Sequence, residues 1–358
     1  MSAVLNTHGV EHFTHVDLRG SVVSYEDLVH FNSLFLAGEM KSIEELTLDT
    51  ISPKWKSLHS FLRGKTTLRH IAVAHFGLTN IDHEFDGLHR LCWLKLDNNQ
   101  LTGSDLKKGF KNSQVTFDRK FCPNRATDTK TLLSVKYNNL VNLQDALLPL
   151  VGLERIGLGG NELNRLHFSE LPKRLEVIEA GKNNISILNV SELRSLASLV
   201  VDGNQLTSLK RSMLVAPNNL LNLHRFMARR NKITHVDVDA FAGMEELYSI
   251  DLSDNELSEI DIDVFRKINA KMWGESLYYG YMGRKWCAVG YINLQRNKFN
   301  ASMKLAVLEY FVHEHDFVWV GDDMPAFGNC YSSREDSMSM PSGRNMVMHK
   351  TGTFRVSV

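Results

Sequence analysis

The chain has 358 residues, which is enough for two ordinary domains or one elongated one. Its 41 Lys and Arg residues balance its 41 Asp and Glu residues, so net charge gives no reason to expect nucleic acid or an anionic membrane as a partner. No apolar run approaches the roughly 20 residues of a membrane-spanning helix, and the N-terminal sequence MSAVLNTHGVEHF lacks the pattern of a secretory signal. We therefore expect an intracellular protein, or a mature or truncated form of a secreted one.

A short unit recurs along the chain, with apolar residues at relative positions 1, 4, 6 and 11 and asparagine at position 9. In LYSIDLSDNEL, from 247 to 257, Ile250 and Leu252 are two residues apart, as inward-facing residues of a short strand are. The chain must turn after this strand, and the side chain of Asn255 can both donate to and accept from the buried backbone of the turn. One unit cannot bury its own apolar edge, so the pattern predicts a stack of coils.

Weaker copies of the unit stand at the N-terminus. Predicted strands centre on Val16, Leu46 and Ile71, and the last two copies carry Ile51 and Phe76 at the asparagine position. Terminal coils of a stack are expected to be atypical because they cap it.

The central copies keep the asparagine, and most of them begin 21 to 27 residues apart. We expect these side chains to form a structural ladder from coil to coil: Asn99, Asn161, Asn183, Asn204, Asn231, Asn255 and Asn297. A degenerate copy is predicted around Leu132, Val135 and Tyr137, with Leu140 in the asparagine position.

Two gaps interrupt the period. The first, at 102–131, holds a basic insertion, and the second, at 271–287, holds an aromatic, Gly-containing one. Each is either a loop near a binding face or a solvated loop without a role. Beyond them, Val318 and Val320 predict a last strand, and residues 331–358 lack periodicity and read as a flexible tail.

Phe241, Met244 and Leu247 follow one another at intervals of three, and Phe265 repeats the phenylalanine 24 residues later. Together with the asparagine-bearing units, this rhythm resembles the typical class of leucine-rich repeat, as found in extracellular arthropod-type immune and receptor proteins. The resemblance implies an α/β fold: a curved, horseshoe-shaped solenoid with a parallel β-sheet on its concave face. We expect it to span residues 1–330, including capping ends.

In such a solenoid, the variable positions of each strand form columns across the concave face. The residues expected there to contact a protein partner are Asp202, Arg225, Arg229, Arg230, Asp251, Asp254, Tyr291 and Arg296. An arginine fork can pair a partner's carboxylate at two points, or it can simply neutralise an aspartate on the next strand. Glycines at positions 157, 159, 160, 181 and 203 leave the sheet thinly covered, so that a partner's backbone can approach closely.

Catalytic patterns are poor. No phosphate-binding glycine loop and no G-x-S-x-G elbow occur, so we expect no enzyme activity and no cofactor. The densest metal-like cluster is His313, Glu314, His315 and Asp316. One alternative is therefore a metal-dependent enzyme that uses His313 and His315, and the other interpretation of this cluster is a polar turn before the last strand.

The four cysteines form no C-x-x-C motif. We expect at most one disulfide, between Cys287 and Cys330, because both lie near the end where a solenoid is capped.

Three glycosylation sequons begin at Asn184, Asn189 and Asn300, and Asn189 is favoured because it lies between motifs. The predicted function is protein recognition outside the cell, in innate immunity or as a receptor ectodomain. The alternative is an intracellular scaffold with reduced thiols.

Overall fold

The computed structural model describes residues 14–22, 24–36, 42–50, 54–122, 130–216, 223–268, 277–279, 285–287, 291–310, 318–320 and 326–328. The chain divides into two compact units, residues 1–196 and 197–358, and each is described by itself.

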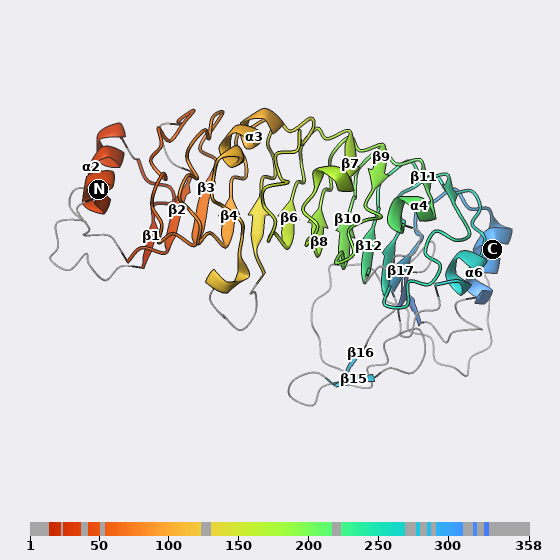
Figure 1. Cartoon of the computed structure of the whole chain (residues 1–358). Coiled ribbons are helices and arrows are strands. Elements are labelled where there is room, and N and C mark those ends of the chain that lie inside the picture. Colours follow the sequence, from red (N-terminus) through yellow and green to blue (C-terminus); the bar gives the residue numbers. More distant parts are fainter. Residues whose placement is uncertain are drawn as a thin grey trace. The chain divides into compact units, whose positions relative to one another are not determined.

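The first unit contains a parallel sheet whose strands follow one another in chain order (Figure 1). These strands are β1 (His15–Asp17), β2 (Glu45–Asp49), β3 (His70–Ala74), β4 (Trp93–Lys95), β5 (Leu132–Ser134), β6 (Arg155–Gly157) and β8 (Val177–Glu179). Leu46 pairs with Ile71, and Ile71 pairs with Leu94, so the apolar residues at position 4 are aligned and buried. This register confirms the frame predicted for the N-terminal copies.

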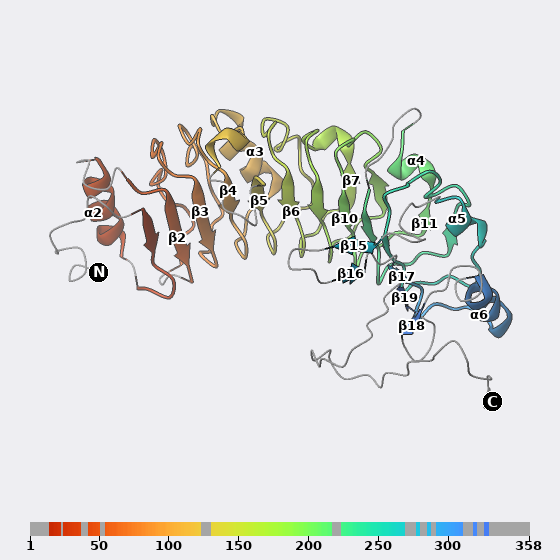
Figure 2. The same cartoon turned by 90° about the horizontal axis from the view of Figure 1, so that it is seen from below.

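The second unit begins with parallel strands and ends with antiparallel ones (Figures 1 and 2). The parallel strands are β10 (Ser198–Val200), β12 (Arg225–Met227), β14 (Ser249–Asp251) and β17 (Tyr291–Asn293). The predicted last strand is present as β18 (Val318–Val320), but it runs antiparallel to β19 (Ala326–Gly328), which itself pairs antiparallel with β17. The second insertion carries an antiparallel pair, β15 (Leu277–Tyr279) and β16 (Lys285–Cys287).

Short elements complete the coils. They are the paired strands β7 (Arg165–His167) and β9 (Ile187–Asn189), the paired strands β11 (Ser208–Leu209) and β13 (His235–Val236), the helices α2 (Tyr25–Leu36), α3 (Gly103–Lys111), α4 (Arg211–Leu214), α5 (Asp263–Arg266) and α6 (Ala301–Leu308), and the 3-10 turns η2 (Arg119–Phe121) and η3 (Phe168–Glu170). Helix α3 opens the first insertion with a capping box, in which Thr102 accepts from the Asp105 N–H and Asp105 accepts from the Thr102 N–H.

The asparagine ladder is present, and its predicted members are buried except Asn297, which is half-buried. Asn99 shows its chemistry: Oδ1 accepts from the N–H groups of Phe76, Gly77 and Leu78, and Nδ2 donates to the carbonyl oxygens of Val73 and Leu96. One side chain thus satisfies the turn of the preceding coil and its own strand end.

Asn138 is a further ladder residue that the sequence analysis missed. Leu133 pairs with Leu94, so this coil begins two residues earlier than predicted, and Leu140 is not in the asparagine position. Asn138 Oδ1 accepts from the Leu101 N–H at 2.9 Å, and its Nδ2 donates to the carbonyl oxygen of Leu96 at 2.9 Å. The prediction was wrong because Lys130, a polar residue, stands at position 1 of this coil.

A disulfide joins Cys92 to Cys122, with their Cα atoms 5.5 Å apart. We expected no disulfide other than Cys287–Cys330, so that expectation is wrong for Cys92 and Cys122. Cys330 and the side chain of Cys287 lie outside the described residues. The pairing arises because the first insertion returns to the start of β4. Arg69 donates to the carbonyl oxygen of Phe121 at 2.7 Å, and the Trp93 indole donates to that of Lys130 at 2.9 Å.

Lys65 is a buried ammonium in the first unit, with 3% of the residue exposed. Its Nζ donates to Asn32 Oδ1 at 2.6 Å and to the carbonyl oxygen of Phe61, and it lies 4.6 Å from the centre of the Phe61 ring. Burial lowers the pKa of Lys65 to about 8, although the nearby Glu84 opposes this shift.

We expect the free energy of unfolding to rise by roughly 2 kcal/mol from pH 7.5 to pH 10 because of Lys65. In this window the unfolded chain still binds a proton on Lys65, whose ordinary pKa is 10.5, whereas the folded chain has lost it. More protons on the unfolded state means that stability increases with pH. Urea unfolding of the native chain and of Lys65→Met at both pH values checks this, and equal pH slopes for the two proteins would contradict it.

Candidate functional site

The charged residues predicted for the sheet lie on neighbouring strands of the second unit. Strands β12, β14 and β17 are in register, so Arg225 pairs with Ser249, and Ser249 pairs with Tyr291. The same alignment continues into the turns, where the Arg230 N–H donates to the Ser253 carbonyl oxygen and the Asp254 N–H donates to that of Gln295. Residues at position 8 of these coils therefore form one line.

Asp254 stands at the centre of that line and holds three guanidinium groups. Arg229 Nε donates to Oδ2 at 2.6 Å, Arg296 donates to both oxygens, with Nη2 to Oδ2 at 2.8 Å, and Arg230 Nε lies 3.7 Å from Oδ2. We call Arg229, Arg230 and Arg296 the arginine row. The Arg230 side chain is 68% exposed and that of Asp254 only 21%, so the carboxylate lies beneath groups that keep N–H donors toward solvent.

The titration of the aspartates follows their surroundings. Burial would raise the pKa of Asp254, but hydrogen bonds from Arg296 and Arg229 outweigh it and hold that pKa below its usual value. Burial raises the pKa of Asp202, although the Arg229 N–H donates to its Oδ1 at 2.8 Å. Asp254 is therefore ionised at neutral pH and keeps the arginine row oriented.

The backbone at position 8 is left-handed. The φ angles of Arg230, Asp254 and Arg296 are 54°, 54° and 53°, whereas the corresponding residue after β10 is Gly203. Glycine adopts this conformation without strain, while a residue with a Cβ adopts it at an energetic cost. The same conformation recurs at this position in other coils, with φ between 52° and 57° at Thr50, His75, Asn98, Tyr137 and Lys182. It is therefore a regular feature of the turn in each repeat, and on this face it holds the exposed charges.

Two predicted contact residues differ from the rest. Asp251 is 5% exposed: its Oδ1 accepts from the Ser253 N–H at 2.9 Å and hydroxyl at 2.5 Å, and its Oδ2 accepts from Asn293 Nδ2 at 3.2 Å. The structure therefore corrects the expectation that Asp251 faces a partner, because Ser253 in the turn after β14 and Asn293 on β17 enclose it. Tyr291 lies in β17, and its side chain is outside the described part of the chain.

Not every glycine of the first unit leaves the sheet uncovered by side chains. A Cβ at Gly157 would lie 2.7 Å from Lys136 Cε, and one at Gly160 would lie 2.4 Å from Tyr137 Cδ1. Side chains of the preceding coil therefore cover these two glycines. At Gly159 only the Gly181 carbonyl oxygen is near, at 3.2 Å from an added Cβ.

Comparison with known proteins agrees with this geometry. The leucine rich repeat family profile matches residues 222–270, the stretch that includes β12 and β14. The chain has the leucine-rich repeat fold. It is 26% identical over 244 residues to Podocan-like protein 1 of Homo sapiens, a match that covers 56% of this chain and 46% of that protein. The chain thus spans about half the length of this curated relative.

Solved structures show the same fold. The LRIM1/APL1C complex contains a chain that superimposes with a TM-score of 0.52 at 17% identity, covering 79% of this chain and 48% of that one. At this identity the likeness concerns the leucine-rich repeat fold alone. Within the described residues, no helix is both long and apolar enough to cross a membrane.

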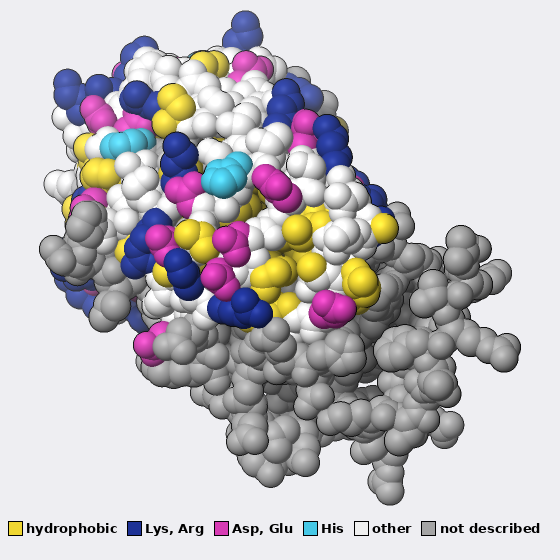
Figure 3. Space-filling view, turned by 90° about the vertical axis from the view of Figure 1, so that its right-hand side faces the viewer, with side chains coloured by type: hydrophobic (Ala, Val, Ile, Leu, Met, Phe, Trp, Pro, Cys, Tyr) yellow, Lys and Arg dark blue, Asp and Glu magenta, His cyan; other side chains and the backbone are white. Residues whose placement is uncertain are grey.

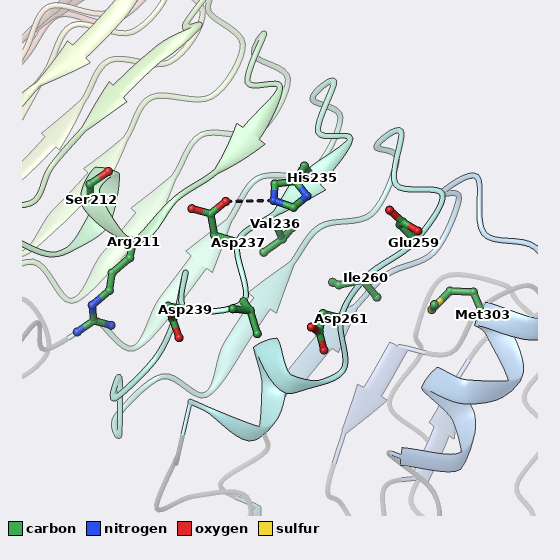
Figure 4. Close-up of a pocket in the computed structure, with 11 residues that line it drawn as sticks. Arg211, Ser212, His235, Val236, Asp237, Asp239, Glu259, Ile260, Asp261 and Met303 are labelled. Atoms are coloured by element: carbon green, nitrogen blue, oxygen red, sulfur yellow. Dashed lines mark hydrogen bonds and ion pairs between the residues drawn. The ribbon is translucent and has the colours of Figure 1, made fainter.

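The second unit of this leucine-rich repeat protein also has an open hollow, lined by residues from β13, α4, the turn before α5 and α6 (Figure 4). Its charges are largely engaged: His235 contacts Asp237 at 3.1 Å, Lys267 contacts Asp239 at 2.9 Å, and Arg211 donates to the carbonyl oxygen of Ala242. Acidic and basic side chains are interspersed over this end of the unit (Figure 3).

A metal site finds no support in the described residues, among which no group of three or more His, Cys, Asp or Glu side chains is arranged to hold an ion. The predicted cluster at His313 and His315 lies outside the described residues.

The sequons differ in exposure. Asn184 is exposed, whereas Asn189 is half-buried in β9 and its Oδ1 accepts from the Ser191 N–H and hydroxyl. Asn300 caps helix α6, and its Oδ1 accepts from the Met303 N–H at 2.8 Å. Asn300 is exposed as well, so exposure favours Asn184 and Asn300 over the Asn189 preferred from the sequence.

Proposed function

We propose that this leucine-rich repeat protein is a non-catalytic recognition module, and that the solvent face of the sheet in its second unit contacts a protein partner. The observation that carries the proposal is the arginine row around Asp254. Three guanidinium groups are oriented by one carboxylate, and their remaining donors face solvent. Arginine is enriched among the residues that dominate binding energy, because its fork pairs a carboxylate at two points.

The competing interpretation is a merely neutralised surface, since exposed ion pairs contribute only about 0–1 kcal/mol to stability. Counting charges argues against complete neutralisation. Among the residues that the structure describes on this face, four arginines, Arg225 and the arginine row, stand beside Asp202, Asp254 and the buried Asp251. The surplus of positive charge favours a partner that presents carboxylates.

The compartment we propose is extracellular, in an immune or receptor-type role. The Cys92–Cys122 disulfide supports this, because disulfides persist outside the cell and are rare in the reducing cytosol. The structural neighbour named above is itself part of a complex between two proteins. An intracellular scaffold with reduced thiols remains the alternative that the experiment below addresses.

We expect Arg225→Glu/Arg230→Glu to weaken partner binding by about tenfold or more while leaving folding intact, because Asp254 keeps Arg229 and Arg296. A photoreactive residue at Met227, in the middle of this face, identifies the partner in extracellular fluid and in cell extract of the source organism. Calorimetry with the purified partner then gives the affinities.

The matched control is Arg266→Glu/Lys267→Glu, which makes the same charge change on and beside helix α5. Unchanged binding by the face variant, or an equal loss with the control, would contradict the proposal. A partner captured only from cell extract would overturn the extracellular assignment.

A further inference from the structure

The basic insertion of the first unit carries three lysines on one side of helix α3. Lys107, Lys108 and Lys111 are exposed, and within the described part of the chain none of them has a carboxylate partner. The other side of the helix is buried, where the rings of Phe110 and Phe85 stack with their centres 5.3 Å apart. The three ammonium groups therefore stand on the solvent side of a helix that is firmly packed.

Helix α3 lies off the sheet, on the outer side of the coils (Figures 1 and 2). It packs on the preceding coil so closely that a Cβ at Gly109 would lie 3.0 Å from the Ile81 carbonyl oxygen. Lys56 flanks the same stretch, because its carbonyl oxygen accepts from the Asn80 N–H at 3.1 Å, and its side chain is exposed and unpaired among the described residues. We call Lys56, Lys107, Lys108 and Lys111 the lysine band.

The coils around the lysine band are strongly basic, although the whole chain has no net charge. Residues 54–122, all of which the structure describes, contain twelve Lys and Arg residues but only six Asp and Glu residues. The six carboxylates have other partners: the His83 ring for Asp82 and Asp86, backbone N–H groups for Glu84, a hydroxyl for Asp97, the helix cap for Asp105 and Lys120 for Asp118. The charge of the lysine band is therefore not cancelled within these coils.

Helix stability alone does not explain the lysine band. Lys107 and Lys111 are four residues apart and Lys108 and Lys111 are three apart, so like charges stand above one another, an arrangement that weakens a helix. The helix dipole favours Lys108 and Lys111, which lie in the last turn, but it gives no reason for Lys56 on the other coil. Anionic groups bound between the ammonium groups would remove the repulsion.

We propose that the lysine band binds a sulfated polysaccharide. Each ammonium donates to sulfate oxygens, and the flexible lysine stems adapt to sulfates that are unevenly spaced along the chain. Binding of a polyanion also releases its condensed counterions, which adds a favourable free energy that a single small anion does not supply. The ligand and the surface both differ from those of the proposed function, since the lysine band lies off the sheet and in the other unit.

The surroundings favour this polyanion over a nucleic acid or an anionic membrane. Residues 54–122 expose no Phe, Trp, Tyr or large aliphatic side chain, so they offer no ring on which a base could stack and no apolar anchor for a bilayer. The Cys92–Cys122 bond holds the end of the same insertion, and disulfides persist outside the cell, where sulfated polysaccharides occur.

The test is fluorescence anisotropy of a labelled heparin decasaccharide with the full-length chain, over a series of sodium chloride concentrations. We expect Lys107→Ala/Lys108→Ala/Lys111→Ala to weaken binding by about tenfold or more. The slope of log Kd against log salt should fall by roughly two, because each lost contact with a single polyanionic strand removes about 0.7. Alanine favours a helix, so α3 should stay folded, and melting curves check this. An unchanged slope would overturn the proposal.

The matched control is Lys232→Ala/Arg266→Ala/Lys267→Ala, which removes the same charge from exposed positions of the second unit. It should bind within about twofold of the native chain, and an equal loss with this control would overturn the proposal. An unsulfated oligosaccharide of the same length should bind about tenfold more weakly or worse. Tighter binding to single-stranded DNA with the same number of charges, or to vesicles of phosphatidylcholine and phosphatidylserine in equal parts, would overturn the assignment to a polysaccharide.

The variant Arg225→Glu/Arg230→Glu separates this proposal from the proposed function. It should keep its affinity for the decasaccharide. Binding that is lost with this variant and kept without the α3 lysines would overturn the lysine band and leave the proposed function standing. Failure of the photo-crosslinking experiment at Met227 would overturn the proposed function independently of the decasaccharide result.

Discussion

Replacing Asn255 with alanine is expected to lower the free energy of unfolding by about 3–5 kcal/mol. Its Nδ2 donates to the carbonyl oxygens of Ala228 and Leu252, each at 3.0 Å, and its Oδ1 accepts from the Ile233 N–H at 3.0 Å. Alanine offers none of these partners, and each buried backbone group left without one costs about 1–3 kcal/mol. Because these groups belong to two successive coils, the loss loosens both of them.

Urea unfolding of purified Asn255→Ala checks this expectation. The control is Asn184→Ala, since Asn184 is exposed and directly follows the ladder residue Asn183. We expect the control to change stability by less than about 0.5 kcal/mol. A native-like unfolding midpoint for Asn255→Ala combined with lost partner binding would contradict the structural role and place the asparagine in recognition.

The ladder and the strand frame could be predicted because a given position of the repeat has the same environment in every coil. Asn255 and Asn99 occupy the same position and make the same kinds of bonds. The prediction failed where the coil around β5 begins with Lys130 instead of an apolar residue. Half-buried Lys130 pairs with Glu176 at 2.5 Å, an interaction between coils that the sequence period does not contain.

That two-residue error also concealed Tyr137. In the predicted frame Tyr137 takes position 6, which points into the core, whereas the register of β5 puts it at position 8, where it is exposed. The first useful signal was available in the sequence: Asn138 lies nine residues into a coil that starts at Lys130. A search that gave the asparagine at position 9 priority over the apolar residue at position 1 would have found the correct frame of this coil.

The charged face was predictable in part. Arg230, Asp254 and Arg296 share position 8, so a column is expected, and the structure aligns them. The burial of Asp251 was not predictable, because it depends on Ser253 in its own coil and Asn293 across the second insertion. Repeat position gives the direction of a side chain, while its neighbours decide how much solvent it meets.

The Cys92–Cys122 bond had no periodic signal at all. The first insertion departs from the repeat through α3 and returns at η2, and nothing in its sequence spacing fixes the return point. The contacts that close it against residues earlier in the chain include the disulfide, the Arg69 bond to the Phe121 carbonyl oxygen and the edge contact between His89 and the Phe121 ring. Because the insertion leaves the repeat and returns to it, the disulfide links two distant points of the chain and therefore contributes to stability.

Cys92→Ala/Cys122→Ala is expected to lower the free energy of unfolding by about 3–4 kcal/mol. The bond closes a loop with a sequence separation of 30, and a crosslink of this span removes about that much conformational entropy from the unfolded chain. Alanine is the chosen replacement because it places no polar group at position 92, where Cys92 is fully buried. The hydrogen bond from Arg69 remains, so we expect the insertion to stay docked in the folded variant.

Urea unfolding with and without dithiothreitol measures the effect. The reductant should destabilise the native chain by about the amount that the double substitution removes. Cys287→Ala/Cys330→Ala is the matched control, and it should respond to the reductant as the native chain does if the Cys92–Cys122 bond alone stabilises the first unit. Free thiols at both Cys92 and Cys122 in protein from an oxidising secretory pathway would contradict the bond and remove the main support for an extracellular site of action. A linked pair, with the expected loss of stability on reduction, means that the first unit is most stable where disulfides persist, which supports an extracellular site of action.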